Sequence, residues 1–254
     1  MLANVLIAIL SGSSLVAGHG KPVVFKGDVG GNGTALAIQG AVVANTGPNK
    51  ATELDTTVFG STKPLSDGLG TTTGQGKVKA AQIGQAMALS GDTLPQVSPG
   101  GNLSGVFHVV TSDGCGSVKA VLDTTATGKF SQGTLLTTTQ DVPGTNGNCP
   151  RSITKKSFVR DVLERSGMIQ RRATNVAMDF PVAFTLPTGV SCTGTVGDVQ
   201  GVCYVKMANT NAAGPFGGVV PIQIAGANNT QAPPAAAPPA TGATNRRQAR
   251  EFSA

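Results

Sequence analysis

Two histidines are the residues of this 254-residue sequence best suited to metal chemistry. His19 follows the small residues Val16, Ala17 and Gly18, which are typical of the positions before a leader-peptide cleavage site. Cleavage after Gly18 would make His19 the first residue, with a free α-amine beside its imidazole. That amine and ring can chelate a metal together, and the ring of His108 would add a third nitrogen. Because amine and imidazole ligands suit copper, we predict a copper site at His19 and His108.

A structural role for both histidines is the alternative, because a single histidine in a strand is commonly a satisfied or half-exposed sheet residue. Other chemistries have weaker support. The sequence contains no GxSxG or HExxH motif, and Gly27–Gly33 lacks the Lys-Ser/Thr that completes a phosphate-binding loop. Four acidic residues could supply the carboxylate pair of a glycosidase, although no motif selects a pair from Asp28, Glu53, Asp55 and Asp113.

Residues 1–18 form an apolar segment that we interpret as a signal peptide. Three N-glycosylation sequons, at Asn32, Asn102 and Asn228, and an even number of cysteines also favour an extracellular or cell-surface protein. No run of 18 apolar residues predicts a membrane span. The absence of Trp and the presence of a single Tyr argue against a stacking surface for nucleic acid. We also expect the protein to be a monomer.

Four cysteines allow three disulfide pairings. Cys192 and Cys203 flank a strand end and turn, so we predict that they pair locally. Cys115 and Cys149 then form the second disulfide, which the chain-entropy model values at about 3–4 kcal/mol. We expect both disulfides to be structural.

The composition predicts an all-β fold, since Gly (35) and Pro (15) are abundant while charged residues make up only 13%. Short β-type runs between turn residues extend over a domain of residues 19–227. Residues 152–172 differ, because apolar side chains at helical spacing predict a basic helical insertion there. Residues 228–254, rich in Pro and Ala and then basic, predict a disordered tail.

The net charge of +6 is concentrated in two segments. Of the 19 basic residues, seven lie between Arg151 and Arg172 and three in the tail. A solvated loop and tail would explain this pattern. Adhesion to an anionic glycan through screened electrostatics is the functional alternative.

Three blocks of sequence resemble the Egh-like family of fungal virulence factors, which are also described as appressorium-specific or cell-surface proteins. They are His19–Leu36, Phe107–Gly114 and Asn209–Gln223. The resemblance implies a fungal source, export and expression around host penetration. The sequence departs from the family pattern at Val219, where a Cys is usual, and in the residues after the Asp113-Gly114 turn.

A mature His-Gly start with a second strand histidine is also similar to the copper lytic polysaccharide monooxygenases. This likeness implies an immunoglobulin-like β-sandwich with long loops, and copper held by His19 and His108. Phe216 would then be the apolar axial residue, with Tyr204 as the second choice, and Gln223 would position the oxygen species. The implied activity is oxidative cleavage of a cell-wall polysaccharide.

Two hypotheses therefore remain. The first is a secreted copper protein with a histidine brace that acts oxidatively on host or fungal cell-wall polysaccharide. The second is a non-catalytic wall or adhesion protein that binds anionic glycans through its basic loop and tail. Because the sequence has few aromatic residues for a flat cellulose-binding face, the first hypothesis favours a soft, branched or anionic glycan.

Overall fold

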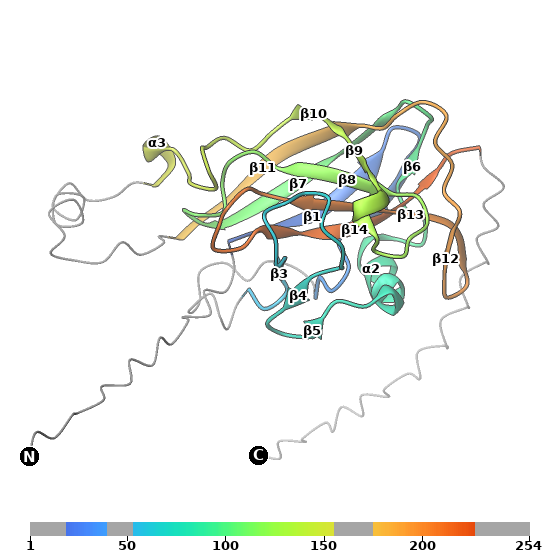
Figure 1. Ribbon diagram of the computed structural model, residues 1–254, viewed down its shortest axis with the longest axis horizontal. Coiled ribbons are helices and arrows are strands. Elements are labelled where there is room, and N and C mark those ends of the chain that lie inside the picture. The colour runs from blue at the N-terminus through green and yellow to red at the C-terminus, as the bar shows by residue number, and fades with distance from the viewer. Residues whose placement is uncertain (1–18, 40–52, 155–174, 227–254) are drawn as a thin grey trace, which may run out of the picture.

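The computed structural model describes residues 19–39, 53–154 and 175–226. The predicted signal peptide, the tail and most of the predicted helical insertion (155–172) lie outside these residues. The all-β class is confirmed, since strands dominate the chain (Figure 1). Its strands are β1 (Gly20–Gly27), β2 (Gly30–Gly33), β3 (Thr57–Val58), β4 (Thr71–Thr72), β5 (Gly76–Lys77), β6 (Gln96–Val97), β7 (Asn102–Thr111), β8 (Lys119–Asp123), β9 (Thr134–Leu135), β10 (Thr137–Gln140), β11 (Asn175–Thr185), β12 (Gly194–Val196), β13 (Val199–Ala208) and β14 (Phe216–Ile224).

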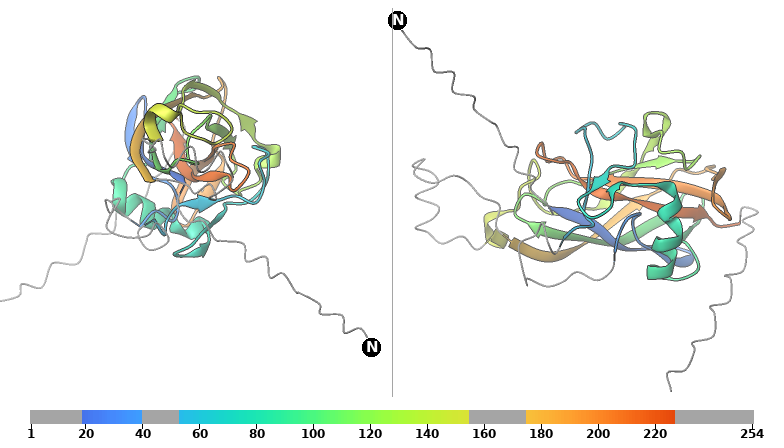
Figure 2. Two further views of the ribbon diagram at one scale, coloured as in Figure 1. Left: turned by 90° about the vertical axis from the view of Figure 1, so that its left-hand side faces the viewer. Right: turned by 90° about the horizontal axis from the view of Figure 1, so that it is seen from below.

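Hydrogen bonds join these strands into one 14-stranded sheet, in which ten strands follow the order β10-β11-β7-β1-β2-β6-β14-β13-β8-β9. Of the other four, β12 pairs with β13, and β3, β4 and β5 follow one another beside β14. The two ends of this order, β9 and β10, are separated in the chain only by Leu136, whose amide donates to Ala120 of β8 at 2.9 Å. The sheet therefore rolls around a common core, as the view along the long axis shows (Figure 2). The link from β1 to β14 runs through the short strands β2 and β6, which share the single register pair Gly30–Gln96.

The inner core follows the strand alternation expected from the sequence. On β7, Phe107 and Val109 point into the main hydrophobic cluster and are 0% exposed, whereas His108 belongs to the opposite face. The predicted disulfides are both present, Cys115–Cys149 and Cys192–Cys203, and each contributes to this cluster. Within the described ranges, no helix is long and apolar enough to cross a membrane.

A second cluster lies outside the sheet, between β13 and a cover formed by β3–β5 and α2 (Ile83–Ser90). The sequence analysis did not predict α2, although Ala, Gln, Met and Leu favour a helix there. The helix is short, contains Gly84 and ends at Gly91, whose φ of 112° suits glycine. Further short helical turns are η1 (Ala80–Gln82), η2 (Phe130–Gln132) and α3 (Arg151–Thr154).

Candidate metal centre

The two histidines lie on adjacent strands and on one face of the sheet. β1 and β7 are antiparallel, with Lys21 opposite His108 and the Val110 amide donating to the His19 carbonyl at 3.2 Å. Gly20 faces the core, where a Cβ would contact the Phe107 ring, so its neighbours His19 and Lys21 face outward. His19 and His108 are thus diagonal neighbours, a relation in which side chains lie about 7–8 Å apart.

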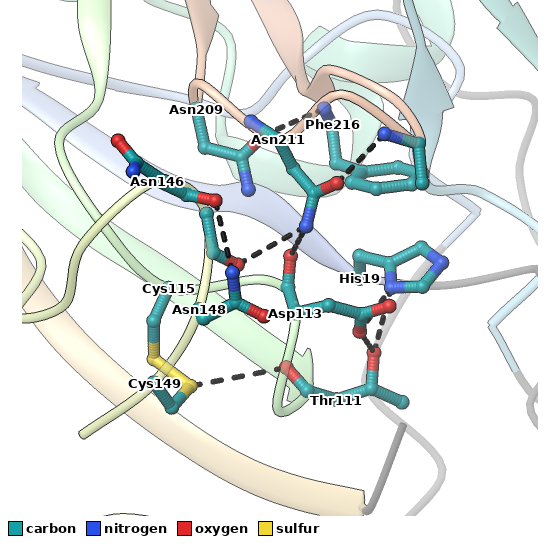
Figure 3. Close-up of polar contacts among 12 residues, drawn as sticks. His19, Thr111, Asp113, Cys115, Asn146, Asn148, Cys149, Asn209, Asn211 and Phe216 are labelled. Atoms are coloured by element: carbon teal, nitrogen blue, oxygen red, sulfur yellow. Dashed lines mark hydrogen bonds and ion pairs between the residues drawn. A yellow bond between two sulfur atoms is a disulfide. The ribbon is translucent and has the colours of Figure 1, made fainter. Parts of the chain in front are cut away.

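The His19 ring is fully buried and its Nδ1 faces two oxygen atoms (Figure 3). One is Thr111 Oγ1, at 2.9 Å, and the other is Asp113 Oδ1. The Thr111 hydroxyl also donates to Asp113 Oδ1 at 2.5 Å, so these three groups form a closed triangle. The remaining ring nitrogen, Nε2, is buried and has no hydrogen-bond partner.

Asp113 is ionised in this arrangement. Burial alone would raise the pKa of its carboxyl, but the hydrogen bond and charge of His19 and the bond from Thr111 lower it below its usual value. A carboxylate beside Nδ1 fixes the orientation of the imidazole and makes its other nitrogen more basic.

Phe216 packs its ring against that of His19. The two ring centroids are 3.8 Å apart with an interplanar angle of 31°. Phe216 is the first residue of β14 and is 1% exposed. The structure thus brings together His19 and the aromatic residue that the sequence assigned to the apolar position.

His108 repeats the pattern seen at His19. Its Nδ1 lies 2.6 Å from Asp179 Oδ1, and Asp179 is the residue opposite it on β11. His108 is 6% exposed, and its Nε2 is buried without a hydrogen-bond partner. Both imidazoles therefore have one nitrogen on a carboxylate and the other unpartnered, which is the usual arrangement of a metal-binding histidine.

A buried ion cluster lies beside His108. Lys21 Nζ is 2.8 Å from Glu53 Oε2 and 2.5 Å from Asp55 Oδ1, and all three side chains are buried. Alternation along β1 places Lys21 beside His108, but it does not predict the distant partners of Lys21. The sequence therefore assigned Lys21 no role. With Asp113 and Asp179, this face carries four carboxylates and one ammonium, an excess of negative charge that favours a cation.

The structure does not bring Gln223 to the histidines, so its expected role needs correction. Gln223 lies at the far end of β14, seven residues beyond Phe216, which corresponds to about 23 Å along a strand. Its amide is fully engaged there, accepting from Gln96 Nε2 and donating to the Gln200 carbonyl, each at 2.7 Å. Tyr204 is likewise remote, since it pairs with Pro221 and belongs to the second cluster.

No three His, Cys, Asp or Glu side chains come together as a metal-binding group among the residues that the structure describes. A metal at the two imidazoles therefore requires a further ligand of another kind. The α-amine that cleavage before His19 would create is such a ligand.

Fold and site together define an all-β, disulfide-bonded protein with a buried pair of carboxylate-bound histidines. The chain belongs to the Egh16-like virulence factor family, whose model matches residues 17–217. It is 34% identical over 235 residues to "Appressoria-specific virulence factor GAS1" of Pyricularia oryzae, covering 91% of this chain and 82% of that protein. "Appressoria-specific virulence factor GAS2" of the same species is 33% identical over 127 residues, or 50% of this chain and 37% of that protein. No solved structure matches the chain.

Proposed function

We propose that this Egh16-like virulence factor is secreted and binds one copper ion through His19 and His108, and that it acts oxidatively on a cell-wall polysaccharide. The amine and ring of His19 and the ring of His108 would hold the ion. One observation carries the proposal: the two imidazoles lie on one sheet face, and His108 has its Nδ1 on the Asp179 carboxylate while its Nε2 is buried and unpartnered.

The surrounding residues suit a bound cation. Asp179 orients the His108 ring through Nδ1, and the carboxylates on this face outnumber the Lys21 ammonium, which favours positive charge. Nδ1 of His19 is also the atom that could chelate a metal together with the α-amine. In the uncleaved chain this atom is held by Thr111 and Asp113, so cleavage is expected to change its partners.

Copper at this position would supply one-electron chemistry with dioxygen or peroxide and removal of hydrogen from a sugar C–H bond. The chain's own contribution would be to bind the ion, to orient the rings and to shield them with Phe216. Among the described residues, the rings of Phe107, Tyr204 and Phe216 are buried, so none of them offers a platform for a flat crystalline glycan. A soft, branched or anionic polysaccharide fits better.

The test compares two forms of the protein that differ by one residue. One begins at His19, and the other carries one additional Gly before it. We expect one tightly bound copper ion per chain in the first form and loss of tight binding in the second. Unchanged affinity of the extended form would contradict the three-nitrogen site.

Activity is tested separately from binding. The copper-loaded protein that begins at His19 is incubated with a reductant and with pectin, β-glucan or chitin, and the soluble products are analysed by mass spectrometry. We expect oxidised oligosaccharides from one of these polymers and none from the matched His108→Ala protein. Equal products from both proteins would overturn an oxidative role for this site.

A non-catalytic adhesion protein is the second candidate. The described residues on either side of the basic segment lie beside the histidine face, because the amide of Cys149 donates to the Ser112 carbonyl and Asn175 pairs with Thr111. Under this proposal, His108→Ala protein still binds cell walls, and binding weakens as salt rises. Binding that is insensitive to salt would exclude an electrostatic adhesion role.

A further inference from the structure

We propose that Asn211 is a positioning residue of the histidine site. Asn211 lies in the connection between β13 and β14 and is 7% exposed. Its side chain links three segments that are far apart in the sequence, and two of them contact His19. This inference rests on the proposed copper site and adds a residue to the groups that hold it.

The Asn211 amide uses both of its donors on backbone carbonyls. Nδ2 donates to the Asp113 carbonyl at 2.6 Å and to the Gly147 carbonyl at 3.1 Å (Figure 3). The first bond fixes the backbone of the residue whose carboxylate faces His19 Nδ1. The second bond ties in the loop that leads to Cys149, where the disulfide to Cys115 returns the chain to the same turn.

The same amide also orders the turn that carries Phe216. Asn211 Oδ1 accepts from the Ala213 amide at 2.8 Å, and the Asn211 carbonyl accepts from Gly214 at 3.2 Å. Asn209 Oδ1 completes the turn by accepting from the Phe216 amide at 3.0 Å. The Asn211 side chain thus joins the backbone of Asp113 to the turn that leads to Phe216.

Close packing leaves no room for another arrangement at this junction. Gly147 has a φ of 78°, and a Cβ there would lie 2.4 Å from Asn211 Cβ. Among side chains of this size, only an amide offers two donors and one acceptor in these directions. An aspartate would retain the acceptor at Ala213 but would place an oxygen against the carbonyls of Asp113 and Gly147.

The test uses Asn211→Asp with Asn148→Asp as the matched control. Asn148 lies in the same loop and is exposed, and its side-chain amide donates to the Asn146 carbonyl at 3.0 Å. Asn148→Asp therefore makes the same charge change at a side chain that does not bond Asp113. Both proteins are prepared beginning at His19. Their copper dissociation constants are measured by chelator competition, and their copper environments by electron paramagnetic resonance.

We expect Asn211→Asp to weaken copper binding about 10–100-fold and to shift the copper hyperfine splitting, as changes at groups that orient metal ligands do. Asn148→Asp should leave both quantities unchanged. If copper binds the parent and both variants equally, the positioning role of Asn211 is overturned while the copper site stands.

A metal-free measurement separates the two proposals. Nitrogen-15 NMR of the two imidazoles in the metal-free protein should show a shift of the His19 signals in Asn211→Asp and no shift of those of His108. If no protein binds copper but the His19 signals still move, the copper site fails and the positioning role stands. If the His19 signals do not move, the positioning role fails whatever the copper result, and the His108 signals report whether Asn211→Asp has kept its fold.

Discussion

The two ends of β14 both contain buried polar side chains, but they differ in how these groups are satisfied. At the end that contains Gln223, the side-chain amide bonds to Gln96 and to the Gln200 carbonyl. At the end that begins with Phe216, His19 and His108 each keep a buried nitrogen without a partner. A fully bonded network stabilises a fold, whereas an unpartnered buried group needs another explanation, such as a ligand. The comparison favours a structural role for the glutamine end and supports the proposal of a copper site at the histidine end.

Replacing His108 should have the largest effect on copper affinity. We expect His108→Ala to weaken copper binding by more than the roughly 100-fold that follows loss of an orienting group, because a ligand itself is removed. Gln223→Ala is the control at the other end and should leave copper affinity unchanged. Isothermal titration of copper into both proteins measures the two affinities. Equal losses of copper affinity would show that the two ends of β14 do not differ in copper binding.

The two disulfides offer a second comparison, on stability. Cys115–Cys149 closes a sequence separation of 34 residues and Cys192–Cys203 one of 11. The chain-entropy model predicts losses of about 4 and about 3 kcal/mol in the free energy of unfolding when each pair is replaced by Ser. Urea unfolding measures these losses. Only the first replacement should also lower copper affinity, because that disulfide supports the turn of Asp113.

Asp179 permits a finer test of the histidine end. Asp179→Asn retains an acceptor for His108 Nδ1 but removes the carboxylate charge, so we expect copper binding to weaken about 10-fold or more. Asp28→Asn is a suitable control, since Asp28 accepts from the Ser98 amide at 2.9 Å and has no contact with either histidine. Similar affinity of Asp179→Asn and the parent would show that the carboxylate does not tune His108.

A pH titration tests a polar group with a structural role in the second cluster. Burial lowers the pKa of Lys206 to about 8, partly offset by the charge of Asp67, and the ammonium donates to the Ser66 carbonyl. Between pH 8 and 10.5 the unfolded chain binds a proton that the folded chain has lost, so stability rises with pH.

Tyr204 acts in the opposite direction at higher pH. Burial and the charge of Asp123 raise its pKa to about 12 from 10, so stability falls as pH rises between these values. Urea unfolding should therefore show a stability maximum near pH 10, and Lys206→Met should abolish the rise below it. A rise that persists in Lys206→Met would assign it to another group.

Replacing Gln223 should have the smallest effect. Gln223→Leu removes one of the two acceptors of Gln96 Nε2 and the side-chain donor to the Gln200 carbonyl, at a cost of about 1–3 kcal/mol in the free energy of unfolding. Copper affinity should not change. If copper affinity fell together with stability, the two ends of β14 would be energetically coupled.

Local patterns were sufficient to predict much of this molecule. Turn residues and short apolar runs predicted the all-β class, and chain spacing predicted both disulfides. Alternation around Phe107 and His108 correctly separated the core face from the histidine face. The strand order was not predicted, because it depends on long-range pairing, such as the return of β9 and β10 to opposite ends of the sheet order.

The candidate site was predictable only where strand register or motif order fixed it. Phe216 was proposed from the Gly-rich turn that precedes its strand, and it does contact His19, while its role at a metal stays a prediction. Gln223 was placed incorrectly beside the histidines. It belongs to the same sequence motif as Phe216, but the two residues lie about 23 Å apart along the strand. Asp113, Asp179 and Lys21 gained their roles through contacts between distant segments, which the sequence pattern does not encode.

Pulsed electron paramagnetic resonance on the copper-loaded protein that begins at His19 tests the central claim most directly, because it counts the imidazoles that ligate the ion. We predict two imidazole signals in the parent and one in His108→Ala. A parent with a single imidazole, or with none, would contradict the joint site at His19 and His108.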